Sequence, residues 1–150
     1  MPERLGRYQL LKLIATGGMG EIFLATREDQ RTGIARQVVI KRILRHLACD
    51  QNFIDLFQNE ARLATQLQHP NIARVYGLEN EGGTYFISME WVEGRSLREI
   101  FARSQKRGLK IAPHLAAYIA SEALRGLHFA HELTDGQGRA LGILHRDVSP

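Results

Sequence analysis

Three glycines lie close together near the start of this 150-residue sequence, in the run ATGGMGE. They are Gly17, Gly18 and Gly20. Because glycine has no Cβ, the backbone N–H groups of such a run can turn inward and approach an anion such as a phosphate. A phosphate-binding loop and a plain hairpin turn both fit these residues. A dinucleotide-binding loop fits poorly, because such a loop leads into a helix, and EIFLAT, which follows, is typical of a strand.

The remaining candidate catalytic or binding residues are single charged side chains. Lys41 ends the apolar run VVIK, where a lysine commonly just extends its ammonium group to solvent. Glu60 lies beside an apolar helical stripe, and a solvated helix face is the alternative there. Asp147 follows an arginine in the closing stretch GILHRDVSP, where it could also cap a turn. None of these residues identifies a site by itself.

A metal site is a weaker possibility. His128 and His131 are three residues apart in a helical pattern and could touch one metal ion. No further ligand lies nearby in the sequence, so helix packing and solvent exposure are the preferred interpretation of both histidines.

Composition places the chain among ordinary globular proteins. It is 44% hydrophobic and 24% charged, with a formal net charge of +4. The basic residues are scattered among acids, so we expect no nucleic-acid partner. No apolar run has the ~18 residues that a membrane span needs, and we expect no secretory leader. The single cysteine, Cys49, excludes an internal disulfide and is typical of a reducing compartment, so we expect a cytoplasmic protein.

The secondary structure predicted to position these residues changes along the chain from strands to helices. Strands are predicted first, with the glycine run as a loop between the first two and tight connections that make an antiparallel meander. From Asp50, a plausible N-cap, apolar residues recur at steps of three and four, which predicts a helix that ends at His69–Pro70. The predicted strands cover residues 8–14, 21–26, 36–43, 72–78 and 84–91.

The last third of the chain is predicted to be helical. Ser96 could cap a helix that runs to about Arg107 and is closed by Gly108. Pro113 can begin a third helix, because the first turn does not need its missing N–H. That helix fades near Leu133, and the glycine-rich run that follows predicts a surface hairpin.

Order and spacing make the sequence closely similar to the protein kinase family. The run ATGGMGEI resembles that family's glycine-rich loop, VVIK its strand lysine and EARLATQL its helix glutamate. HPNI follows the helix as in the family, YFISMEWVEG resembles the segment that joins the two lobes, and HRD the start of the catalytic loop. The GGMGE and HRDVSP runs are most like those of bacterial Ser/Thr kinases. The resemblance covers the chain from about Tyr8 to Pro150.

This resemblance implies a fold and a domain organisation. We expect an α+β, protein-kinase-like small lobe, with a five-stranded antiparallel sheet and one helix, over residues 1–90. A hinge would cover residues 91–95, and residues 96–150 would begin a helical lobe that is incomplete because the chain stops within the catalytic loop.

The resemblance also implies roles for named residues. Lys41 would bind the α- and β-phosphates of ATP and pair with Glu60, and Asp147 would accept the proton of the substrate hydroxyl. Met89 would guard the back of the adenine pocket, and Glu90 and Val92 would offer it backbone groups. The full set of expected ATP-binding residues is Ile14, Ala15, Thr16, Gly17, Gly18, Met19, Gly20, Ile22, Val39, Lys41, Met89, Glu90 and Val92.

Three departures from the family pattern bear on the chemistry. Ala15 replaces a glycine and adds one methyl group to the loop. Ser149 stands where Ser/Thr kinases usually carry a lysine that neutralises the transferring phosphoryl group. The metal-binding asparagine and the DFG aspartate do not occur in these 150 residues, so Mg²⁺ ligands are expected beyond residue 150 and none within the chain.

The sequence therefore predicts part of an enzyme that transfers phosphate from ATP to protein serine or threonine hydroxyls. We expect the 150 residues alone to be inactive, because they supply no pair of Mg²⁺ ligands. The alternative is a non-catalytic, kinase-like binding or regulatory module. ATP and a protein substrate are the expected partners, and no membrane segment is expected within the chain.

Overall fold

The computed structural model describes residues 3–28, 32–145 and 148–149. The elements run in the order β1 (Arg4–Leu5), β2 (Tyr8–Thr16), β3 (Gly20–Glu28), β4 (Ala35–Ile43), α1 (Gln51–Ala64), β5 (Val75–Glu81), β6 (Thr84–Glu90), α2 (Leu97–Lys106) and α3 (Pro113–His131). They form two compact units. The first holds residues up to Gln68 together with Ala73–Trp91, and the second holds His69–Ile72 and the chain from Val92 onward.

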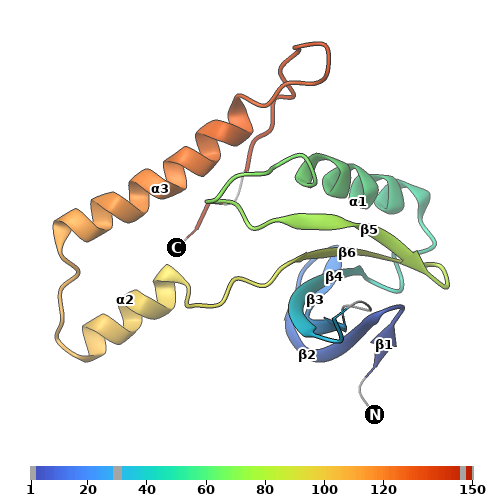
Figure 1. Cartoon of the computed structure of the whole chain (residues 1–150), viewed down its shortest axis with the longest axis horizontal. Coiled ribbons are helices and arrows are strands. Elements are labelled where there is room, and N and C mark those ends of the chain that lie inside the picture. Colours follow the sequence, from blue (N-terminus) through green and yellow to red (C-terminus); the bar gives the residue numbers. More distant parts are fainter. Residues whose placement is uncertain (1–2, 29–31, 146–147, 150) are drawn as a thin grey trace. The chain divides into compact units, whose positions relative to one another are not determined.

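The first unit is built on one antiparallel sheet with the strand order β1-β2-β3-β4-β6-β5, which curls around its core (Figure 1). The predicted five strands are all present. The sixth, β1, pairs Leu5 with Tyr8 across a turn in which Gly6 has a φ of 55°. A two-residue strand gives no period-2 signal, so the sequence pattern could not reveal it.

Strand alternation sorts the β4 side chains onto two faces of the sheet. Val38 and Ile40 belong to a core cluster on one face, with Tyr8 and Phe86. Ile43 belongs to a second cluster, on the face that α1 covers. Lys41 therefore shares its face with Ile43, and its neighbour Arg42 lies on the opposite face.

Helix α1 closes the second cluster with Ile54, Phe57 and Ala61, which are buried at the predicted helical spacing. Its predicted start is confirmed, because the Asp50 carboxylate accepts a hydrogen bond from the Asn52 amide at 2.9 Å. The predicted end at His69–Pro70 is wrong, because the helix ends at Ala64.

The early end of α1 has a local cause. After Ala64 the backbone bonds tighten from four-residue to three-residue steps, with Gln66 donating to Leu63 and Leu67 donating to Ala64. The Thr65 hydroxyl also donates to the Arg62 carbonyl at 2.9 Å. Such short-range bonds compete with continuation of the helix.

In the second unit, α2 and α3 begin as the sequence predicts. Ser96 and Glu99 form a reciprocal capping box at the start of α2, and Gly108 follows its end with a φ of 65°. Pro113 is the first residue of α3. The predicted surface hairpin is also present, held by an antiparallel bridge between Thr134 and Ala140.

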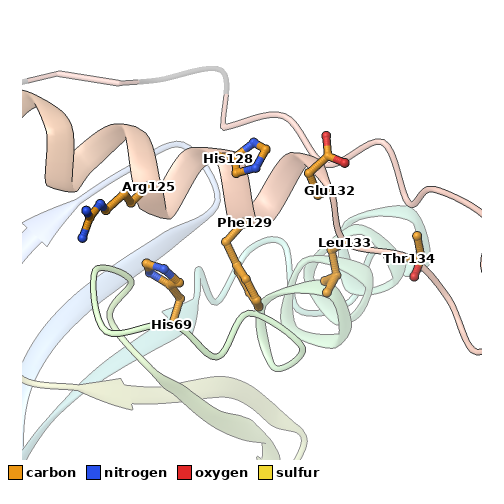
Figure 2. Close-up of a pocket in the computed structure, with 7 residues that line it drawn as sticks. All are labelled: His69, Arg125, His128, Phe129, Glu132, Leu133 and Thr134. Carbon is orange, nitrogen blue, oxygen red and sulfur yellow. The ribbon is translucent and has the colours of Figure 1, made fainter.

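The segment His69–Ile72 packs on α3. A Cβ on Gly126 would lie 3.2 Å from the Asn71 carbonyl oxygen, so the helix and the segment touch closely there. The Asn71 amide also donates to the Glu122 carboxylate at 2.9 Å. Beside this contact the rings of His69 and Phe129 lie 5.2 Å apart and line a cavity of about 450 Å³ (Figure 2). Among the described residues, no helix is long and apolar enough to span a membrane.

Candidate functional site

The glycine run forms the tip of the β2–β3 hairpin, where the Gly17 amide donates to the Gly20 carbonyl at 2.8 Å. Only Gly20 is required by packing, because a Cβ there would lie 2.7 Å from the Arg42 carbonyl oxygen. Gly17 and Gly18 do not have a positive φ, and a Cβ on Gly18 would meet nothing within 4 Å. Gly17 and Gly18 therefore leave exposed backbone at the hairpin tip, although the hairpin uses the Gly17 amide.

Strand register brings five of the predicted ATP-binding residues onto the sheet face that Lys41 shares. In the β2–β3 pair Ala15 lies opposite Ile22, and in the β3–β4 pair Ile22 lies opposite Lys41. Val39, two residues before Lys41, lies opposite Met89 on β6. This face of the sheet therefore carries the apolar residues Ile22, Val39 and Met89, with the ammonium group of Lys41 beside them.

Lys41 and Glu60 meet across the sheet–helix interface, with 2.5 Å between Nζ and Oε1. The helix stripe positions Glu60, because Phe57 and Ala61 are buried and Glu60 lies at the edge of that stripe. The Lys41 ammonium also lies 5.8 Å from the centre of the Phe57 ring. The two paired side chains are 22% and 46% exposed, so the pair contributes only about 0–1 kcal/mol to stability. Its main effect is to fix where a cation stands.

Glu90, the last residue before the predicted hinge, makes a reciprocal contact with Arg74. The Glu90 amide donates to the Arg74 carbonyl at 2.8 Å, and the Glu90 carboxylate accepts from the Arg74 amide at 2.9 Å. The Glu90 amide is therefore occupied, and the carbonyl is the backbone group that this residue could offer to a base. Val92 lies in the second unit and is 62% exposed.

The predicted catalytic-loop residues are the least defined by the structure. Arg146 and Asp147 lie outside the described residues. His145 and Ser149 are described and exposed. The structure therefore gives no geometry for the predicted proton acceptor.

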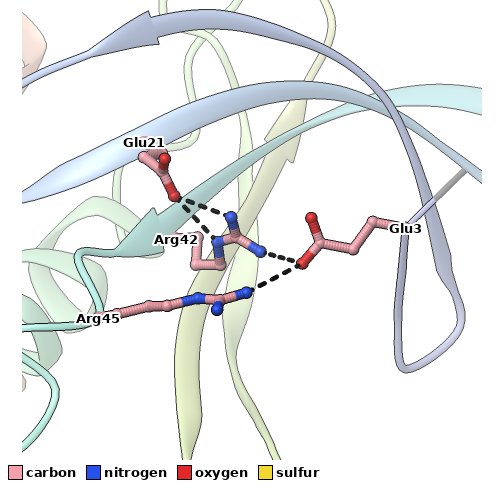
Figure 3. Close-up of polar contacts among 4 residues, drawn as sticks. All are labelled: Glu3, Glu21, Arg42 and Arg45. Carbon is pink, nitrogen blue, oxygen red and sulfur yellow. Dashed lines mark hydrogen bonds and ion pairs between the residues drawn. The ribbon is translucent and has the colours of Figure 1, made fainter.

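Sequence reasoning missed a charged cluster on the opposite face of the sheet (Figure 3). Arg42, only 8% exposed, donates from Nε and Nη2 to the same Glu21 oxygen at 3.2 and 2.8 Å. Its Nη1 donates to Glu3 at 2.5 Å, and Arg45 lies 3.9 Å from the same Glu3 oxygen. The Arg42 guanidinium also lies 4.6 Å from the centre of the Phe23 ring. The alternation of Lys41 and Arg42 was the one sequence signal that placed Arg42 on this face.

Burial and pairing act in opposite directions on Arg42. Burial lowers the pKa of Arg42, but the hydrogen bonds that Arg42 donates to Glu21 and Glu3 outweigh burial, so this pKa is raised above its ordinary value. The cluster therefore stays charged and ties the hairpin tip to β4 and to the start of the chain.

The described residues contain no group of three or more histidine, cysteine, aspartate or glutamate side chains arranged to hold a metal ion. His128 lines the cavity beside α3 with Arg125 and Glu132 (Figure 2). The arrangement suits packing and solvent contact at the end of the helix.

Comparison with known proteins agrees with this geometry. A family model described as "Protein kinase domain" matches residues 8–150. The chain is 40% identical to the tyrosine-protein kinase MasK of Myxococcus xanthus and 37% identical to the serine/threonine-protein kinase PknA of Mycobacterium tuberculosis, in each case over 97% of its length. It spans 22% and 31% of those two proteins.

A solved structure shows the same fold. The Mycobacterium tuberculosis PknI kinase domain is 25% identical, with a TM-score of 0.67, and the match covers 99% of this chain and 55% of that one. The chain belongs to the protein kinase family.

Proposed function

We propose that these residues are the nucleotide-binding part of a protein kinase that transfers phosphate from ATP to serine or threonine hydroxyls. In this proposal residues 1–90 are the small lobe, 91–95 the hinge and 96–150 the start of the helical lobe. The observation that carries it is the Lys41–Glu60 pair, which stands on the same sheet face as Ile22, Val39 and Met89.

The residues present fit the phosphates and base of ATP. The Gly17 amide is used within the hairpin, but the exposed backbone at Gly18 can face phosphate oxygens, and a cation held by Glu60 can neutralise part of their charge. The apolar side chains of Ile22 and Val39 can contact the faces of a base. Bound ATP would supply the phosphoryl group, and the chain would orient it and exclude water from it.

The described residues assign no step to Mg²⁺, because they hold no cluster of ligands for it. Asp147 is proposed as the acceptor of the hydroxyl proton, on the strength of its HRD context alone. We therefore expect the 150 residues assayed by themselves to bind nucleotide without transferring phosphate.

A fluorescent ATP analogue tests nucleotide binding. The chain should bind it, and Lys41→Met should weaken binding by about tenfold or more because the phosphate charge loses its counterion. Lys110→Met, which removes an exposed lysine of the second unit, is the control and should bind as the parent does. Absence of binding by the parent, or equal loss in both variants, would refute the proposal.

The alternative is a non-catalytic regulatory module of kinase-like fold. The activity of the gene product that carries these residues distinguishes it from the proposal. If the proposal holds, that gene product phosphorylates protein, and Asp147→Asn removes the activity. Phosphoamino-acid analysis of the product identifies the hydroxyl. Phosphotyrosine alone would replace the Ser/Thr assignment, and the relative MasK is a tyrosine-protein kinase by name.

The proposed location is the cytoplasm. Cys49 is a free, exposed thiol, which is typical of a reducing compartment where ATP is also available.

A further inference from the structure

The net positive charge of the chain is concentrated in one short region of the second unit. Residues 95–110 hold six of the 20 lysines and arginines but only one of the 16 acidic residues, a formal charge of +5. The remaining residues hold 14 basic and 15 acidic side chains, a net charge of −1. The scattered distribution expected from the sequence is therefore an accurate description only outside this region.

These cations are exposed and largely unpaired. Arg95 lies 3.7 Å from Glu99, the one acidic residue of the region. For Arg98, Arg103, Lys106 and Arg107 the described part of the chain provides no ion-pair partner, and α2 has no buried residue. Like charges so close together repel one another, so an anionic partner would gain attraction from several of them at once.

The surface of the same region contains a groove. This groove, of about 540 Å³, is lined by basic side chains, by the acidic Glu99, and by the apolar side chains of Ile100 and Leu109, which are 39% and 60% exposed. Its basic lining residues are Arg95, Arg103, Lys106 and Arg107. Cations around an exposed apolar patch suit a ligand that offers carboxylates beside an apolar side chain.

We propose that this groove docks a carboxylate-rich segment of the protein substrate, with an apolar residue of that segment against Ile100 and Leu109. The inference rests on the proposed function, since it takes the occupant to be a protein that the kinase phosphorylates. The charge of the groove sets the preference for aspartate and glutamate.

Two other anionic surfaces fit the groove less well. Single-stranded nucleic acid binds through aromatic side chains on which bases stack, and none of the described residues that line the groove is aromatic. A helix that lies on a membrane needs an apolar face along its length. In α2 the large apolar residues Leu97, Ile100 and Phe101 fall within a single turn.

Fluorescence anisotropy of a labelled glutamate-rich peptide with a central pair of leucines tests the proposal on the intact chain. The peptide should bind, and binding should weaken as ionic strength rises from about 0.05 M to about 0.3 M. A peptide with glutamine in place of every glutamate should bind at least about tenfold more weakly.

Charge reversal locates the binding surface. Arg103→Glu with Arg107→Glu should weaken peptide binding by about tenfold or more. Lys12→Glu with Arg36→Glu makes the same change of net charge at exposed positions of the sheet and should alter binding less than about twofold. Equal effects of the two double variants, or equal binding of the glutamine peptide, would overturn the proposal.

Two competitors complete the test. An oligothymidylate or vesicles with anionic lipid that displaced the peptide more strongly than unlabelled peptide would also overturn the proposal. ATP-analogue binding is measured on every variant. Loss of peptide binding with nucleotide binding retained concerns the groove alone, whereas absence of nucleotide binding in the parent would refute the proposed function.

Discussion

Gly20 lies against the backbone of Arg42, so closely that a methyl group on Gly20 would stand 2.7 Å from the Arg42 carbonyl oxygen. This approach sets the base of the hairpin that carries Gly17 and Gly18. Arg42 then holds the next residue, Glu21, with two hydrogen bonds from its guanidinium group. One residue of β4 thus fixes the hairpin by its main chain and by its side chain.

The first prediction concerns this backbone contact. Gly20→Ala should lower the free energy of unfolding by about 1–3 kcal/mol, because a backbone atom must move to admit the methyl group. Gly18→Ala, where the added Cβ meets nothing within 4 Å, should change it by less than about 0.5 kcal/mol. Urea denaturation of both variants measures the difference, and equal values would contradict the role assigned to Gly20.

The second prediction concerns the charge on Arg42. Arg42→Gln leaves Glu21 and Glu3 without their shared cation, and Glu21 is only 25% exposed. We expect a loss of about 1–3 kcal/mol in the free energy of unfolding, because a partly buried carboxylate loses its partner. Arg36→Gln, at an exposed strand position, is the control and should fall within about 0.5 kcal/mol of the parent. The same denaturation experiment decides between them.

The third prediction separates positioning from stability at Glu60. Glu60→Gln should weaken binding of the ATP analogue by about threefold or more, because Lys41 is no longer held in place. Its free energy of unfolding should change by less than about 1 kcal/mol, since the pair is partly exposed. Asp55→Asn removes the same charge from an exposed position on α1 and should leave nucleotide binding unchanged. If Glu60→Gln lowered the free energy of unfolding as well as the nucleotide affinity, Glu60 would have a structural role instead.

The fourth prediction concerns pH and the hairpin after α3. The Arg139 and Gln137 amides donate to the Asp135 carboxylate and hold the pKa of Asp135 below its ordinary value of 3.8, with help from the Arg139 side chain. A carboxyl group with a lowered pKa stabilises the fold above the ordinary value and loses that effect as pH falls through the lowered one. The amide resonances of Gln137 and Arg139 should therefore shift with a midpoint below 3.8. Asp135→Asn should abolish that titration, and a midpoint at or above the ordinary value would contradict the assigned bonds.

Local patterns were sufficient for most of the fold. Apolar and β-branched runs located the five long strands, and the capping residues Asp50 and Ser96 located the starts of two helices, because these signals act within a few residues. The end of α1 was misplaced because the tightening after Ala64 depends on weak local bonds that have no strong sequence mark. The strand β1 escaped notice because it exists only through pairing with β2.

The candidate site was less predictable from the sequence than the fold was. Lys41 and Glu60 were named from their family context, and their meeting depends on how α1 packs over β4, which no local pattern specifies. The Arg42 cluster joins residues as distant as Glu3 and Arg42, so it emerges only once the sheet has formed. The role of Asp147 stays a prediction.

The segment His69–Ile72 belongs to the second unit, although the chain on both sides of it belongs to the first. The polypeptide therefore passes between the units at three places, after Gln68, after Ile72 and after Trp91. A protease that cut between Val92 and Arg95 would leave residues 69–72 on the N-terminal piece, still packed against Gly126 of the C-terminal piece. This contact therefore joins the two pieces noncovalently, in addition to the covalent link at residues 92–95.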